Sequence, residues 1–150
     1  MKANTQKIKE AFTASFTLSG AAVEISTAKP GRPMDNSKSR SSARKALRKL
    51  FEAGELLYIP GPRGGMEKAT FFFPEHAPNF NELSGKKVRA KSVAIIEQTW
   101  PLKYIPGWYG PGALQDPENG AHVARVRSGG EGAGYYGTEH YGSYVEVEFY

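Results

Sequence analysis

The clearest pattern in the chain is the run SRSSARKALRKLFEAG at 39–54, in which apolar and basic positions alternate with the period of an α-helix. At about 100° per residue, the apolar side chains gather on one side of this helix: Ala43, Ala46, Leu47, Leu50 and Phe51. The opposite side carries four cations and a serine: Arg44, Lys45, Arg48, Lys49 and Ser41. Ser39, Ser41 or Ser42 can cap the start of the helix, and Gly54 is placed to end it.

The residues before this helix predict shorter elements. The pattern at 4–14 predicts a helix capped by Asn4 or Thr5. The segment 15–28 fits two structures, since Phe16 and Leu18 alternate like a strand while Ser19 can cap a helix. Residues 29–39 are expected to be irregular because of their proline and glycine content.

After the basic helix, the pattern predicts a β-hairpin. Alternating residues at 57–59 and a β-rich run at 69–73 flank the turn sequence PGPRGG. Residues 76–86 are expected to form a linker, with at most one helical turn.

The C-terminal half, 87–150, has a mainly β pattern. Strands are expected within 87–98, 121–127 and 144–150, and the last shows the cleanest alternation of apolar and acidic residues. The segments between them, 100–120 and 128–143, are rich in glycine, proline and aromatic residues and are expected to be irregular.

The order of short helix, second helix or turn, basic helix and hairpin over about residues 5–74 resembles the winged helix–turn–helix family. The strongest part of the resemblance is SSARKALRKLFEAGELLYIPGPRGGMEKATFFF. The resemblance implies an α+β fold, with an N-terminal winged helix–turn–helix at 1–75 and a small β-rich C-terminal region. It also implies that helix 40–53 enters the major groove of DNA and that the hairpin 57–73 is the wing. The connection before the basic helix is longer than the tight turn usual in the family.

Eight positions of the sequence match the DNA-contacting parts of the family. Arg40, Ser41, Arg44, Lys45, Arg48 and Lys49 match the exposed face of a recognition helix, and Arg63 and Lys68 match the phosphate contacts of a wing. The segment KPGRP at 29–33 resembles part of an AT-hook, but Pro30 replaces its first arginine, so a basic surface loop is favoured. Lys29 and Arg32 in that loop are expected to assist at phosphates.

Charge distribution points to the same half of the molecule. The formal net charge is +5 and the pI is about 9.4. Residues 1–75 hold 13 Lys+Arg and 7 Asp+Glu, whereas 76–150 hold 7 and 8, so the excess positive charge lies wholly in the first half. This asymmetry favours a phosphate-binding module joined to a module with another task.

The aromatic residues of the C-terminal half are candidates for a partner-binding or self-association surface. They are Trp100, Tyr104, Trp108, Tyr109, Tyr135 and Tyr136. The alternative, that these residues cover the core of a thin sheet, is slightly favoured.

Catalytic chemistry has little support in the sequence. Three histidines are scattered at 76, 122 and 140 without metal-binding spacing, and the absence of cysteine excludes disulfides, thiolate zinc sites and cysteine nucleophiles. The glycine-rich stretches lack the residues of a phosphate-binding loop. No enzyme activity, cofactor or metal is therefore expected. The absence of a long apolar run indicates no membrane association and favours a cytoplasmic protein.

Two functions follow from these patterns. The leading hypothesis is a sequence-specific or architectural double-stranded DNA-binding protein, of which a transcription regulator is the commonest form, with a C-terminal half that binds a second copy or another protein. The alternative is a winged-helix inhibitor or adaptor that binds protein, such as a phage-borne factor acting on a host complex.

Overall fold

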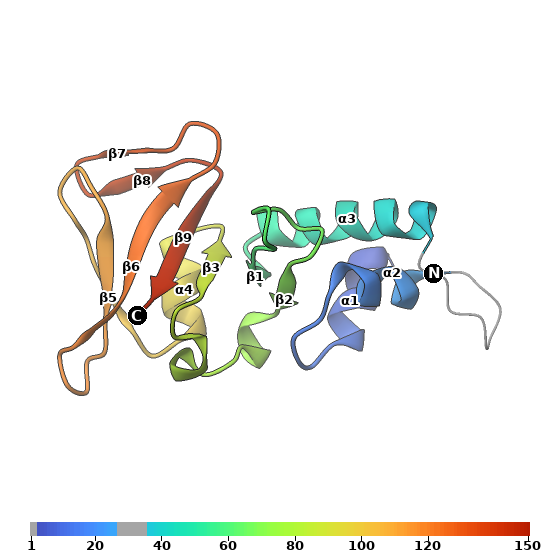
Figure 1. The fold of residues 1–150 in the computed structure, drawn as a ribbon, viewed down its shortest axis with the longest axis horizontal. Coiled ribbons are helices and arrows are strands. Elements are labelled where there is room, and N and C mark those ends of the chain that lie inside the picture. The colour runs from blue at the N-terminus through green and yellow to red at the C-terminus, as the bar shows by residue number, and fades with distance from the viewer. Residues whose placement is uncertain (1–2, 27–35) are drawn as a thin grey trace. The chain divides into compact units, whose positions relative to one another are not determined.

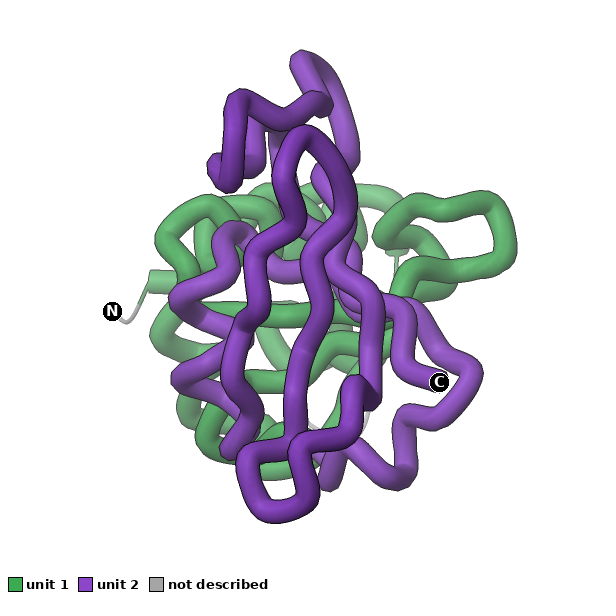
Figure 2. Tube along the Cα trace, turned by 90° about the vertical axis from the view of Figure 1, so that its left-hand side faces the viewer, with its two compact units in different colours: residues 1–77 green, residues 78–150 purple. Residues whose placement is uncertain are grey.

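The computed structural model describes residues 3–26 and 36–150, so Lys29 and Arg32 lie outside the described residues. The chain is an α+β protein that divides into two compact units, 1–77 and 78–150 (Figure 2). Much of the expected linker belongs to the second unit, because a short 3₁₀ helix at Phe80–Leu83 buries Leu83 and Gly85 bonds to Phe149.

Three helices open the first unit: α1 (Asn4–Ala11), α2 (Leu18–Ile25) and α3 (Ser37–Glu52) (Figure 1). Helix α1 ends three residues before the expected position, because Phe12 adopts extended backbone and its ring stacks on Phe16 at 4.1 Å. Residue Ala3, and neither Asn4 nor Thr5, is its N-cap.

Helices α2 and α3 start at caps that differ from the expected ones. The Thr17 hydroxyl, in place of Ser19, accepts from the Gly20 N–H at 3.1 Å. The Asn36 side chain accepts from the Ser39 N–H at 2.8 Å, so α3 begins before the serines expected to cap it. Asparagine is among the strongest N-caps, which explains the earlier start.

A short antiparallel hairpin completes the first unit. Strands β1 (Leu57–Ile59) and β2 (Thr70–Phe72) pair from Leu57↔Phe72 to Ile59↔Thr70. Phe16, between α1 and α2, forms an isolated antiparallel bridge with Phe71 in β2. Both alternatives for segment 15–28 are therefore partly correct, since Phe16 pairs like a strand residue and Leu18 starts a helix.

The core of the first unit lies between the three helices and the hairpin. The apolar face of α3 is buried as expected, and the fully or almost fully buried side chains around it include Ile8, Leu18, Leu56, Phe71 and Phe72. This core fixes the hairpin against the helices. A 3₁₀ turn at Pro74–His76 follows β2.

The second unit is built on an antiparallel sheet in the order β3, β9, β6, β5, β4. These strands are β3 (Lys87–Ala90), β4 (Lys103–Ile105), β5 (Gly112–Gln115), β6 (His122–Gly129) and β9 (Tyr144–Phe149). A separate two-stranded hairpin pairs β7 (Gly134–Tyr136) with β8 (Glu139–Tyr141).

One strand expectation is wrong in its second half. Residues 87–98 split into β3 and helix α4 (Val93–Thr99), which Figure 1 draws beside β3. Ile95 and Ile96 are buried, as is Trp100 directly after the helix, a spacing that suits one face of a helix. The expected strands at 121–127 and 144–150 are confirmed as β6 and β9.

Four short strands were not expected from the sequence, because β4, β5, β7 and β8 lie in the segments rich in glycine, proline and aromatic residues. Within the two described ranges, no helix is both long and apolar enough to cross a bilayer.

Candidate nucleic-acid interface

The outward face of α3 presents a group of exposed cations. Lys45, Arg48 and Lys49 are exposed, as is Ser41, because the buried residues of the same helix hold the opposite face against the core. None of these three cations forms an ion pair with a residue in 3–26 or 36–150. Their charges are therefore available to an external anion.

Arg40 and Arg44 lie at the side of α3 that faces the hairpin, and both bond to one carboxylate. The Arg40 Nη2 atom lies 2.5 Å from Glu67 Oε1, and the Arg44 Nη2 atom lies 2.8 Å from Glu67 Oε2. Arg40 Nη1 also donates to the Ser19 Oγ of α2 at 2.6 Å. Hydrogen bonds from Arg44 and Arg40 hold the pKa of the Glu67 carboxyl below its usual range. These three contacts link α2, α3 and the hairpin.

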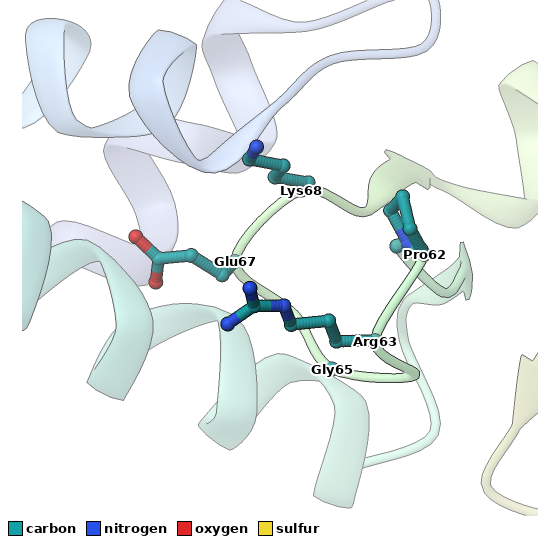
Figure 3. Close-up of a pocket in the computed structure, with 6 residues that line it drawn as sticks. Pro62, Arg63, Gly65, Glu67 and Lys68 are labelled. Carbon is teal, nitrogen blue, oxygen red and sulfur yellow. The ribbon is translucent and has the colours of Figure 1, made fainter.

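The hairpin turn is a glycine-rich loop with two exposed cations, Arg63 and Lys68. Gly61 donates to the Gly65 carbonyl at 3.1 Å, and Gly64 has a φ of 79°, a backbone conformation that favours glycine. Residues of the turn line an open hollow of about 350 Å³. Figure 3 shows the side chains of Arg63, Glu67 and Lys68 around this loop.

The structure therefore places most of the expected DNA-contacting residues in one unit. The cations of α3 differ, however, in whether they pair with a carboxylate. Lys45, Arg48 and Lys49 have no described carboxylate partner, whereas Arg40 and Arg44 share one. Sequence reasoning missed Glu67 and Ser19. The signal for Glu67 was present, since it is the only acidic residue between 57 and 73.

The expected partner surface of the second unit separates into a buried part and an exposed part. Trp100 is 4% exposed, its ring packs edge-on against Phe149, and its indole N–H donates to the Pro78 carbonyl, so it is a core residue and a correction to that expectation. Trp108, Tyr109 and Tyr136 are 72%, 61% and 73% exposed. The Tyr109 N–H donates to the Gly137 carbonyl. This hydrogen bond connects the loop that carries Trp108 and Tyr109 to the β7–β8 hairpin.

The two remaining aromatics, Tyr104 and Tyr135, are half-buried around His140. The Ser128 hydroxyl donates to the Gly134 carbonyl at 3.0 Å, so its oxygen is the acceptor for the His140 Nδ1–H at 2.9 Å. His140 Nε2 is then the acceptor for the Tyr104 hydroxyl. The Tyr135 hydroxyl accepts from the Ser128 N–H. This network fixes the β7–β8 hairpin on the sheet with His140 neutral.

We expect the stability of the second unit to fall at mildly acidic pH because of His140. Burial lowers the pKa of its imidazole, so the unfolded chain takes up the proton first. The stabilisation is complete above the ordinary histidine pKa of about 6.5 and is lost as pH falls through the lower folded-state value. Lys91 and Glu139, which carry charges of opposite sign, line the same hollow as His140.

The measurement is chemical unfolding, followed by tryptophan fluorescence, at about pH 8 and about pH 5. His140→Gln should flatten the pH dependence, whereas His122→Gln, at an exposed position on β6, should keep it. An equal pH dependence in wild type and His140→Gln would contradict the assignment.

Among the described residues, no group of three or more His, Asp or Glu side chains could hold a metal ion. No family model matches the sequence, and no similar protein was found among curated proteins or solved structures.

Proposed function

We propose that the first unit binds double-stranded DNA as a winged helix–turn–helix and that the protein is a DNA-binding regulator. The observation that carries the proposal is the set of exposed cations on α3, Lys45, Arg48 and Lys49, without a described carboxylate partner. A helix with an apolar inner face and a cationic outer face beside a basic hairpin suits a groove lined by phosphates.

The order of elements supports the winged-helix interpretation. The chain runs through α1, an isolated bridge residue at Phe16, α2, α3 and the β1–β2 hairpin, and Phe16 pairs with Phe71 of β2. The resemblance stated for residues 5–74 implies this order of helices and hairpin. The connection between Ile25 and Ser37 stays longer than the family's usual turn.

Each cation has a role in this proposal. A helix about 10–12 Å in diameter fits the major groove, where an arginine can donate two hydrogen bonds to guanine. Arg48 is exposed on α3 and is proposed as the base-reading residue. Lys45, Lys49 and Ser41 contact phosphate oxygens, and Arg63 and Lys68 extend these contacts from the hairpin.

The test is the binding of a labelled duplex to the full chain, followed by fluorescence anisotropy across a salt series. Neutralising about three to five phosphates predicts a log–log slope of roughly −3 to −4.5. No binding at low salt, or a slope near zero, would count against the proposal.

A second function is favoured by a different observation, the exposure of Trp108, Tyr109 and Tyr136. Large exposed aromatics on an anchored loop are typical of protein interfaces, so the chain could act as an adaptor, alone or in addition to DNA binding. Two results together would favour the adaptor function: the first unit does not bind DNA, and residues 106–111 and 136–138 contact a purified protein partner.

A further inference from the structure

We propose that Arg40 and Arg44 form an oxyanion site that Glu67 occupies in the free protein, and that a phosphate group displaces the carboxylate when the first unit binds its ligand. Glu67 thus acts as an internal competitor for phosphate. The oxyanion site stands on the geometry of the free protein, whereas its effect on DNA affinity rests on the proposed function.

The geometry is that of an anion held by two converging guanidinium groups. Each arginine donates to a different oxygen of Glu67, at 2.5 and 2.8 Å. The two arginines are four residues apart on α3, so their side chains are neighbours on the helix surface. Like charges at this separation repel each other, and an anion between them offsets the repulsion. A phosphate group carries at least the same negative charge and at least as many acceptor oxygens, so it can replace the carboxylate.

Glu67 is placed to leave without dismantling the site. Its side chain is 55% exposed, and an ion pair open to solvent is weak and screened by salt. Glu67 lies in the glycine-rich hairpin loop, where Gly64 and Gly65 impose few limits on the backbone. Arg40 is 24% exposed and keeps its 2.6 Å bond to Ser19 after Glu67 departs. The cationic half of the site is therefore preorganised.

Two roles for Glu67, competing with phosphate and positioning Arg44, predict opposite effects of its removal on DNA binding. If Glu67 only positioned Arg44 for DNA, its removal would weaken binding. If Glu67 competes with phosphate, its removal takes away the negative charge that the two arginines share and strengthens binding. The lowered pKa of the Glu67 carboxyl keeps the competitor charged at neutral pH.

The experiment compares Glu67→Gln with Glu55→Gln in the full chain. Both variants remove one negative charge from an exposed ion pair in the first unit, since Glu55 pairs with Lys9 at 2.9 Å. The first probe is inorganic phosphate, followed by the NMR shifts of the Ser19, Arg40 and Arg44 amides. The second probe is a labelled DNA duplex.

Glu67→Gln is expected to bind phosphate and duplex about three- to tenfold more tightly than wild type, with a salt slope steeper by about 1. Glu55→Gln is expected to match wild type. Unchanged or weaker phosphate binding by Glu67→Gln, or an equal gain in Glu55→Gln, would overturn the proposal.

The two probes separate this inference from the proposed function. Tighter phosphate binding by Glu67→Gln with no duplex binding by any form would retain the oxyanion site and reject the DNA-binding function. Duplex binding by wild type that Glu67→Gln does not strengthen would retain the DNA-binding function and reject the competition by Glu67.

Discussion

Replacing Lys45 and Arg48 together by glutamine is expected to weaken binding to duplex DNA by about 10- to 100-fold at low salt. Both side chains are exposed on α3 and pair with no described carboxylate, so the variant removes two charges that the fold does not use. The salt slope should become shallower by about 1 to 2. The free energy of unfolding should change by less than about 0.5 kcal/mol, because the positions are on the surface.

A matched control is the double variant Lys86→Gln and Lys103→Gln in the second unit. Both lysines are exposed, and the change in net charge is the same. Affinity should fall much less in this control. An equal loss in the two double variants would show that only overall charge matters, and no loss in either would reject α3 as the interface.

Replacing Phe71 by alanine is expected to destabilise the first unit by about 3–5 kcal/mol. Phe71 is fully buried in β2, its ring lies 5.7 Å from that of Phe16 and 5.6 Å from that of Tyr58, and its backbone forms the bridge to Phe16. The substitution leaves a cavity where the hairpin meets the helices. DNA affinity should fall together with stability, because the hairpin is no longer held firmly against α3.

The measurement for Phe71→Ala is chemical unfolding followed by far-ultraviolet circular dichroism. Both tryptophans lie in the second unit, so their fluorescence does not report on this core. The helical signal does report on the core of the first unit, because α1, α2 and α3 contain 8, 8 and 16 residues, whereas α4 in the second unit contains 7. Val23→Ala, at a position 38% exposed, is the control. A loss below about 1 kcal/mol for Phe71→Ala would contradict its central place in the core.

Elements with a strong local signal could be predicted from the sequence, and those set by packing could not. Helix α3 and strand β9 each bury one face, so their periodicity is visible in one dimension. The start of α3 was placed late because Asn36 follows a segment dominated by proline and glycine. Helix α4 was missed because its short apolar run, Val93 to Ile96, fits a buried strand as well as a helix.

The candidate site was predictable in composition but not in electrostatics. The cations of α3 follow from the sequence because helical geometry alone places them together. The sequence does not show which of these cations pair with a carboxylate. Glu67 is 27 and 23 residues away from Arg40 and Arg44 and reaches them only once the hairpin folds back on α3. Likewise, Trp100 and Trp108 look alike in sequence, yet one fills the core and the other is 72% exposed.

The most direct test of the central claim, that the cationic face of α3 and the hairpin loop bind duplex DNA, is an NMR titration of the isotope-labelled full chain with a short duplex. The account predicts that the largest shifts of amide signals fall at Ser41, Lys45, Arg48, Lys49 and Arg63, with small shifts throughout 78–150. Shifts concentrated at Trp108, Tyr109 and Tyr136, or none at saturating duplex, would contradict it.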